Sequence, residues 1–245
     1  MQWLAVLVAP FIGSFLGVLI RRLPRGEPVG WTRSACETCA GPLGAGDLLP
    51  IVSFLAIRGR CRACRAPISG FHLAIELAAV VVALGAVALA PEPQLVWAGC
   101  VLGWWLLALA WIDARHMLLP DALTLPLILA GLGVAWLDDP VTVPAHALGA
   151  AAGYLAFRAV GVCYARLRGR DGLGEGDAKL LAAGGAWVGW QPLADLVLVA
   201  ALAALAVGLG IAVYRRRLQR DLTLPFGPFL AIALWGIWVW QSWTM

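Results

Sequence analysis

Residues 193–213 read LADLVLVAALAALAVGLGIAV, a run in which Asp195 is the single charged side chain. A helix needs about 20 apolar residues to cross the hydrocarbon core of a bilayer, so this run predicts a transmembrane helix. The rest of the chain has the same character, because 62% of its 245 residues are hydrophobic and 13% are charged. Soluble domains have roughly 45–50% apolar and about 25% charged residues. The composition therefore predicts a membrane protein and excludes an ordinary soluble domain.

Eight apolar runs along the chain have the character of membrane helices, and the run 178–191 is the shortest and most glycine-rich of them. Long runs of this kind cross a bilayer as helices, because a helix satisfies its own backbone hydrogen bonds. The approximate ranges are 2–20, 72–91, 94–112, 119–137, 143–164, 178–191, 193–213 and 228–244. The predicted fold is an all-α, polytopic membrane helical bundle of about eight transmembrane helices, with the first run retained as a helix. No internal repeat is evident.

Basic residues fall on one side of this predicted bundle. With the N-terminus outside, 17 of the 18 Lys and Arg residues lie in the loops after the first, third, fifth and seventh runs, or at helix ends there. The exception, Arg158, lies in the fifth run, and the outer loops carry only acidic charges, at Glu92, Asp138, Asp139 and Asp195. Cytoplasmic loops of membrane proteins are enriched in Lys and Arg. We therefore expect both termini outside, and the net charge of +4 reflects topology and not a nucleic-acid interface.

The predicted organisation is a first transmembrane helix over 1–20, a cytoplasmic loop over 21–71 and a seven-helix membrane domain over 72–245. The loop contains two Cys-x-x-Cys pairs, Cys36 with Cys39 and Cys61 with Cys64. This spacing is typical of a four-thiolate zinc site, which has no open position for water and is therefore structural. Two disulfides or four free thiols are the alternatives. A reducing cytoplasm disfavours disulfides, and the paired spacing disfavours free thiols. Cys100 and Cys163 lie in apolar runs and are expected to pack there.

Two aspartates are expected at the same cytoplasmic depth on different helices. Asp113 ends the third run, and Asp177 opens the sixth in the string Gly174-Glu-Gly-Asp-Ala-Lys179. Singly, each has a structural interpretation: Asp177 as a helix cap and Asp113 as a helix end, just as Asp121 is expected to cap the fourth run. As a pair they favour catalysis, because two adjacent carboxyls share a proton and one can then deprotonate a water molecule. The glycines allow a substrate backbone to approach closely.

Several short motifs occur in a fixed order over nearly the whole chain. The motifs are Gly13-Ser-Phe-Leu, Arg22-Leu-Pro24, the two cysteine pairs, Asp47-Leu-Leu-Pro50 with Ser53, Gly59-Arg-Cys-Arg62, Ile68-Ser69, Ile112-Asp113, Leu119-Pro-Asp121, Gly174-Glu-Gly-Asp177 with Lys179-Leu180, and Leu224-Pro-Phe-Gly-Pro-Phe-Leu230. Each motif alone is weak, but the ordered set is specific. Together they resemble the type IV prepilin peptidases, intramembrane aspartyl proteases of the Gly-x-Gly-Asp class.

The resemblance implies that Asp113 and Asp177 are the catalytic pair, with Gly174, Glu175, Gly176 and Lys179 supporting the active-site loop. It further implies a bacterial inner-membrane enzyme that cuts pilin or pseudopilin precursors after a glycine, at the cytoplasmic face. S-adenosylmethionine-dependent methylation of the new N-terminus is implied by the resemblance alone. The oligomeric state is left open.

Departures from the family pattern lie near the cysteine loop. Gly17 stands where the family usually has Asn, and Phe71-His72-Leu73 replaces an Arg-Tyr-Pro run. A transporter that uses Asp113, Asp177 and Glu76 as a proton or cation relay is the alternative from another class. A signal-peptide-peptidase-like protease is the other alternative. The three histidines show no metal-ligand spacing and are expected to be structural; they are His72, His116 and His146.

Overall fold

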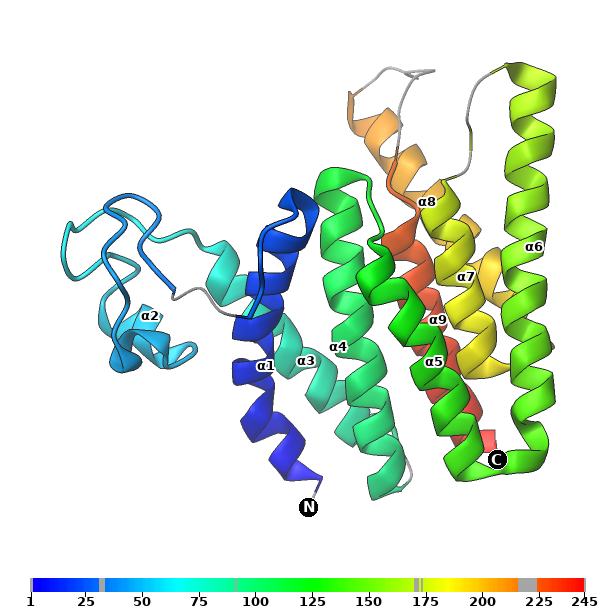
Figure 1. Ribbon diagram of the computed structural model, residues 1–245, viewed down its shortest axis with the longest axis horizontal. Coiled ribbons are helices and arrows are strands. Elements are labelled where there is room, and N and C mark those ends of the chain that lie inside the picture. The colour runs from blue at the N-terminus through cyan, green and yellow to red at the C-terminus, as the bar shows by residue number, and fades with distance from the viewer. Residues whose placement is uncertain are drawn as a thin grey trace. The chain divides into compact units, whose positions relative to one another are not determined.

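The computed structural model describes residues 2–30, 34–90, 92–169, 172, 174–215 and 224–244, and these residues form helices without any extended sheet (Figure 1). The α-helices are α1 Trp3–Arg22, α2 Val52–Ala56, α3 Phe71–Leu89, α4 Pro93–His116, α5 Asp121–Asp138, α6 Val143–Arg168, α7 Glu175–Val188, α8 Leu193–Arg215 and α9 Gly227–Thr244. Three 3₁₀ turns are η1 Leu23–Arg25, η2 Ala45–Leu48 and η3 Pro140–Thr142. The predicted all-α fold is confirmed.

Each of the eight predicted runs corresponds to one helix, with ends displaced by a few residues. Six of these helices are long and apolar enough to cross a bilayer, namely α1, α3, α4, α5, α6 and α8. Helix α7 has 14 residues. At about 1.5 Å per residue it is roughly 21 Å long, short of the ~30 Å hydrocarbon core. The chain is therefore a polytopic membrane protein in which α7 is a short internal helix.

The chain folds as two compact units, Met1–Trp104 and Trp105–Met245, and the boundary falls within α4. In the first unit, α1 packs on α3 through small residues. A methyl group on Gly13 would lie 2.6 Å from the Cα atom of Glu76 and 3.0 Å from the Cβ atom of Ala79. Lipid tails are apolar, so the hydrophobic effect does not drive membrane helices together. Their association depends on close packing, which small residues allow because the backbones can then approach. Gly13 thus sets the spacing between α1 and α3.

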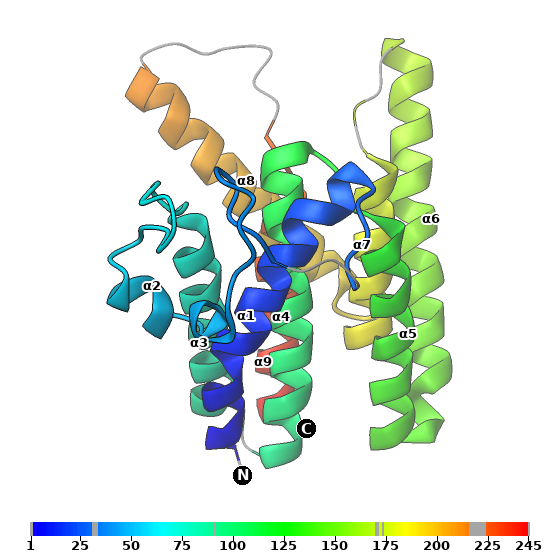
Figure 2. The same cartoon turned by 60° about the vertical axis from the view of Figure 1, so that its left-hand side comes forward.

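In the second unit, α7 lies at the centre of the packing. Ten of its 14 residues are buried. Figures 1 and 2 both show α7 alongside α6. The close approach depends on glycine, because a methyl group on Gly185 would lie 2.1 Å from the carbonyl carbon of Gly149 on α6. The indole nitrogen of Trp187 also donates to the Leu127 carbonyl of α5, at 2.9 Å. The part of α7 from Leu180 to Val188 is apolar on all sides, and the neighbouring helices bury it.

The outer helices of this unit present leucines to the surroundings. On α8, the exposed side chains include Leu198, Leu202, Leu205 and Leu209. Exposed apolar surface of this extent is unfavourable in water and favourable in lipid, which agrees with the predicted bilayer environment.

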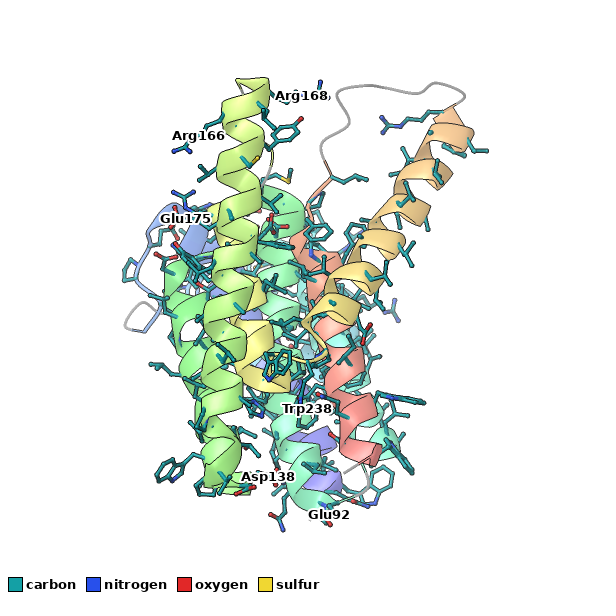
Figure 3. The ribbon with its side chains drawn as sticks, turned by 90° about the vertical axis from the view of Figure 1, so that its right-hand side faces the viewer. Glu92, Asp138, Arg166, Arg168, Glu175 and Trp238 are labelled. Atoms are coloured by element: carbon teal, nitrogen blue, oxygen red, sulfur yellow. The ribbon has the colours of Figure 1, made fainter. Side chains whose placement is uncertain are left out.

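Charged residues of the second unit separate toward its two ends. Figure 3 shows Arg166, Arg168 and Glu175 near one end and Asp138 at the other. This separation agrees with the predicted clustering of basic residues on one membrane side. Further basic residues used in that prediction lie outside the described residues; they are Arg33, Arg170, Arg216, Arg217 and Arg220. The orientation in the membrane stays a prediction, as does the functional division at residues 20 and 71.

Candidate active site and metal centre

Asp113 lies in the last turn of α4 and is almost fully buried, with 6% of its surface exposed. The helix ends shortly afterwards, where Met117 adopts a left-handed φ of 52°. A buried carboxylate needs hydrogen-bond donors, since desolvation of an unpaired charge is costly. The Oδ2 atom of Asp113 accepts the backbone N–H of Gly227 at 2.9 Å. Asp113 is therefore fixed by the first residue of α9, from a distant part of the sequence.

Gly227 is required at this position because there is no space for a side chain. A Cβ atom would lie 2.7 Å from Oδ2 of Asp113 and 3.0 Å from its Cγ. The first N–H groups of a helix have no partner inside the helix, and the helix dipole favours an anion there. The string Leu224-Pro-Phe-Gly-Pro carries part of the family resemblance, but its residues alone predict no role for Gly227. The structure shows that this glycine brings a helix N-terminus onto Asp113.

Asp177 is the third residue of α7 and not its cap, since Gly174 occupies the cap position in extended conformation. The backbone N–H of Gly174 donates to the Asp177 carboxylate, which is the return half of a capping box. Burial and, to a smaller extent, the negative charge of Asp113 raise the pKa of Asp177 to about 6, although the hydrogen bond from the Gly174 N–H acts in the opposite direction. Asp113 thus acts electrostatically on Asp177, as expected for two carboxyls that share a site.

Gly176 explains why the residue before Asp177 has no side chain. A methyl group on it would lie 2.8 Å from Cβ of Leu119. Leu119 is buried in the loop that joins α4 to α5, three residues beyond the end of α4. The loop that follows Asp113 therefore packs directly against the turn that carries Asp177. This contact holds the two carboxyl-bearing segments together.

Lys179 connects α7 to α5 beside this turn. Its Nζ atom lies 2.7 Å from Oδ1 of Asp121 and 3.1 Å from Oε1 of Glu175. The Lys179 side chain is 20% exposed, whereas the two carboxylates are more than half exposed. The expectation that Asp121 caps α5 is wrong: Pro120 is the cap, and no side chain caps this helix. Asp121 instead anchors Lys179, a role that sequence reasoning missed because the partner is 58 residues away.

The four loop cysteines lie together, as predicted. Their Sγ atoms are all within 4.8 Å of one another, and those of Cys36 and Cys64 are 3.9 Å apart. Tetrahedral zinc with Zn–S distances of about 2.3 Å requires S–S distances of roughly 3.8 Å. The arrangement can therefore hold one tetrahedral metal ion. None of the four forms a disulfide, so the two-disulfide alternative finds no support in the described residues.

The two cysteine knuckles have the same local structure. The Cys36 N–H donates to the Gly41 carbonyl and the Cys61 N–H to the Ala66 carbonyl, each at 2.9 Å. The residue after the second cysteine of each pair, Ala40 or Arg65, has a left-handed φ of 53° or 59°. The sequence expectation of no internal repeat is wrong at this scale, because Cys-x-x-Cys-x-x-Pro occurs twice, 25 residues apart.

Backbone donors favour the thiolate form of Cys36. The backbone N–H groups of Cys39 and Thr38, in that order of importance, lower the pKa of Cys36 to about 6. The thiolate is the form that binds metal.

Asp47 joins the second knuckle to the preceding loop, since its carboxylate lies 2.6 Å from Nε of Arg62 and accepts the Gly44 N–H at 3.1 Å.

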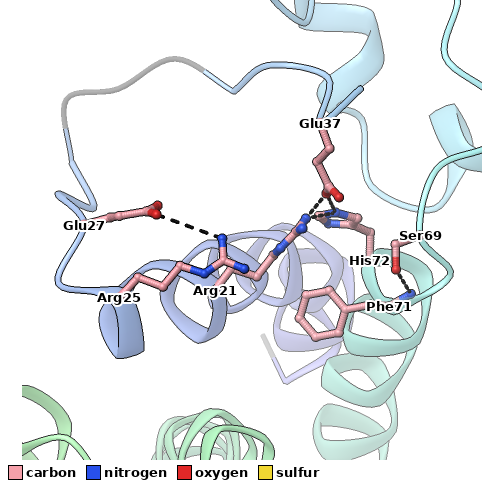
Figure 4. A network of polar contacts seen from close by, with 7 residues as sticks. All are labelled: Arg21, Arg25, Glu27, Glu37, Ser69, Phe71 and His72. Atoms are coloured by element: carbon pink, nitrogen blue, oxygen red, sulfur yellow. Dashed lines mark hydrogen bonds and ion pairs between the residues drawn. The ribbon is translucent and has the colours of Figure 1, made fainter. Parts of the chain in front are cut away.

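The histidines bind other protein groups where contacts are described. His72 lies beside Arg21 and Glu37 in a polar network that joins α1, α3 and the cysteine loop (Figure 4). On α6, Nδ1 of His146 lies 3.0 Å from the carbonyl of Ala186 on α7. Neither belongs to the group of four cysteines that could hold a metal among the described residues.

Comparison with known proteins places both halves of the chain in one family. Residues 100–209 match the model described as "Type IV leader peptidase family", and residues 7–90 match the "Bacterial Peptidase A24 N-terminal domain". A prepilin leader peptidase/N-methyltransferase of Burkholderia pseudomallei is 40% identical over 252 residues, which cover 93% of this chain and 81% of the relative. The chain belongs to the type IV leader peptidase family.

Other members of the family are similar over their length as well. The prepilin leader peptidase/N-methyltransferase of Aeromonas hydrophila is 38% identical, over 97% of this chain and 90% of the relative. That of Pseudomonas aeruginosa is 35% identical, over 96% of this chain and 89% of the relative. No solved structure matches the chain significantly.

Membership of the leader peptidase family confirms the predicted protease class and disfavours the transporter alternative. In that alternative, Glu76 was to relay protons with Asp113 and Asp177. In the structure, Glu76 belongs to the first compact unit and accepts the backbone N–H of Ile51 at 2.7 Å. The two aspartates belong to the second unit, which contains most of the matched peptidase region.

Proposed function

We propose that this leader peptidase is an aspartyl endopeptidase whose catalytic groups are Asp113 and Asp177. The observation that carries the proposal is the pairing of the two carboxyls. Asp113 is buried and raises the pKa of Asp177, although the two residues lie on different helices. Each carboxyl accepts a backbone N–H, from Gly227 and Gly174 respectively. A buried carboxyl and a half-buried one, each held by a neutral donor, are suited to sharing one proton.

The shared proton gives the pair its chemistry. The ionised carboxylate removes a proton from water, and the water oxygen bonds to the carbonyl carbon of the scissile peptide. The protonated carboxyl donates to the carbonyl oxygen as negative charge develops there. The tetrahedral species then collapses, the C–N bond breaks, and the nitrogen takes a proton from the pair. Because the two groups titrate as a unit, the roles of acid and base belong to the pair.

The substrates we propose are pilin or pseudopilin precursors, because the similar relatives are named prepilin leader peptidases. Their leader would be cut at the cytoplasmic face of a bacterial inner membrane, with both termini of this chain outside. The position of Arg166 and Arg168 at the end of the second unit opposite Asp138 supports that orientation. Glu175, half exposed beside Asp177, offers a negative charge to a basic leader.

The cysteine cluster is proposed to hold structural zinc, with Cys36, Cys39, Cys61 and Cys64 as its ligands. Four protein thiolates complete a tetrahedron, so the ion would stabilise the loop and not bind substrate. Methylation of the new N-terminus is proposed because the relatives are also named N-methyltransferases. S-adenosylmethionine supplies a methyl group that passes from its sulfur to the amine nitrogen, which releases a proton.

The test is to replace Asp113 or Asp177 with Asn and to co-express each variant with a pilin precursor. Mass spectrometry of the precursor should show intact leader for both variants and cleaved, methylated product for the unaltered enzyme. Asp195→Asn is the matched control, because Asp195 is an exposed carboxylate in the first turn of α8. Complete cleavage by either Asn variant, at normal membrane levels, would refute the assignment of the pair.

A further inference from the structure

Two helices of the second unit, α6 and α8, separate from each other near the proposed catalytic pair. No residue of α6 after Gly153 and none of α8 after Ala200 is buried by the residues that the structure describes. Figures 2 and 3 both show α8 leaning away from α6 toward the C-terminal end of α6. We call residues 154–168 of α6 and 201–215 of α8 the diverging halves. Protein packing covers neither half, so a partner can reach both.

The diverging halves present an almost entirely apolar surface. Before the last three residues of each half, Arg158 is the single charged side chain. The exposed apolar side chains include Leu155, Val160 and Leu167 of α6 and Leu202, Leu205, Leu209 and Val213 of α8. A methyl group on Gly210 of α8 would meet nothing within 4 Å, and small residues let another membrane helix approach closely. This surface suits an apolar helix.

Two aromatic rings connect the diverging half of α6 with the start of α9. The ring centroids of Phe157 and Phe226 are 6.2 Å apart, and both side chains are partly exposed. Phe226 immediately precedes Gly227, whose N–H donates to Oδ2 of Asp113 at 2.9 Å. The pair of rings therefore lies beside the segment that holds one of the two proposed catalytic carboxyls.

The packing of α6 on α7 places Phe157 level with the other carboxyl, that of Asp177. The two helices run in opposite directions (Figure 1), and a methyl group on Gly153 of α6 would lie 2.7 Å from the Leu181 carbonyl oxygen of α7. Phe157 follows Gly153 by one helical turn, and Asp177 precedes Leu181 by one turn. Phe157 and Asp177 are therefore at the same height along the two helices.

The side of α7 that faces α5 is closed at this height. A methyl group on Gly176 would lie 2.8 Å from Cβ of Leu119, and Nζ of Lys179 lies 2.7 Å from Oδ1 of Asp121. A substrate with an apolar segment must approach through lipid, because withdrawal of that segment into water is unfavourable. It can do so from the side of the diverging halves, where the surface is apolar and exposed.

We infer that the diverging halves of α6 and α8 dock the apolar segment of the precursor, with the Phe157–Phe226 pair contacting the part of that segment next to the scissile bond. The inference rests on the proposed peptidase function and gives its substrate a binding surface. The occupant is a membrane-inserted apolar helix. Its contact with the two rings would hold the adjacent peptide bond at the height of the carboxyl pair.

The first experiment is site-specific photocrosslinking of the full-length enzyme in lipid nanodiscs. A photoreactive phenylalanine analogue replaces Phe157 in the Asp113→Asn enzyme, which keeps the precursor uncut. It should crosslink a co-reconstituted pilin precursor, and mass spectrometry should locate the crosslink in the apolar segment. The same analogue at Leu155 is the matched control, because Leu155 is 63% exposed at a similar height but about 200° around the helix. It should crosslink several-fold less.

The second experiment combines Phe157→Ala with a shortened substrate. With the full precursor, this variant should lower kcat/KM at least about tenfold, mainly through KM, as expected for loss of a central apolar contact. With a peptide that keeps the leader and the scissile bond but lacks the apolar segment, the loss should be less than about twofold. Leu155→Ala should change neither value.

Two results would overturn the inference. Equal crosslinking from positions 155 and 157 would show that the diverging halves face lipid alone. Equal losses for the two substrates would show that the rings act only by supporting the start of α9. Crosslinking needs no cleavage, so it would persist if Asp113 and Asp177 were not the catalytic pair. Normal cleavage by the unaltered enzyme without a crosslink from position 157 would refute the docking surface and leave the proposed function in place.

Discussion

Gly227→Ala is the substitution that tests most directly how the second unit prepares Asp113. The new Cβ atom would lie 2.7 Å from Oδ2 and 3.0 Å from Cγ of Asp113. Nonbonded carbon atoms are ordinarily about 3.5–4.0 Å apart, so the carboxyl or the start of α9 must move by roughly 0.5–1 Å. Such a displacement breaks or lengthens the hydrogen bond of 2.9 Å from the Gly227 N–H.

The expected loss of rate follows from that hydrogen bond. A hydrogen bond to a charged group contributes about 1.5–3 kcal/mol. If it orients the carboxylate in the transition state, its loss lowers kcat/KM by about 10- to 150-fold. Displacement of a reacting group by about 1 Å has a similar effect. We therefore expect Gly227→Ala to lower kcat/KM for a prepilin peptide at least about tenfold, with the protein still inserted and monodisperse.

The assay is cleavage of a purified precursor by the enzyme in nanodiscs, followed by mass spectrometry over time. Gly236→Ala is the matched control, since it makes the same change in the same helix and its Cβ would meet nothing within 4 Å. The control should cleave at the unaltered rate. If Gly227→Ala also cleaves at that rate, then the N-terminus of α9 does not orient Asp113 for catalysis and the reasoning is refuted.

Two further predictions concern the supports of the site and the cysteine cluster. Lys179→Met and Asp121→Asn should each lower kcat/KM by a few-fold, because half-exposed ion pairs contribute about 0.2–1 kcal/mol. The double variant should lose no more than either single one, and additive losses in kinetic assays would show that the pair does not act as a unit. Metal analysis should find one zinc ion per chain, which Cys61→Ser reduces and Cys163→Ser, a change of an exposed thiol on α6, leaves in place. Limited proteolysis should then cut the loop faster in Cys61→Ser, whereas equal protection in the two variants would contradict a structural role for the metal.

Much of the candidate site could be recognised without coordinates because its signals are local in sequence. The cysteine spacing predicted a cluster, and the four Sγ atoms indeed lie within 4.8 Å of one another. Asp113 and Asp177 were predicted to be functional because an ionisable group at the end of a membrane helix is energetically costly and is usually kept for a function. The catalytic role of the pair stays a prediction, which the upward effect of the Asp113 charge on the pKa of Asp177 supports.

Local signals failed where a residue's partner is remote. Asp121 follows a proline at the start of a helix, so capping was the expected role, yet its partner is Lys179 on α7. The transporter alternative placed Glu76 in a relay with the two aspartates, whereas Glu76 accepts the backbone N–H of Ile51 in its own unit. Neither outcome has a signature in the neighbouring residues, because a carboxylate is satisfied by whichever donor the packed helices bring to it.

The sequence by itself determined that the chain is a helical membrane protein and where its long helices lie. It also identified the cysteines and aspartates that are candidate functional residues. These properties follow from composition, run length and spacing, all of which are local in the chain. Only the tertiary structure decided that α7 is a short buried helix, that Gly227 donates to Asp113, and that Glu76 accepts the Ile51 N–H at the wall of a cavity. Each of these depends on how closely two backbones approach, and that distance is set by packing between segments far apart in sequence.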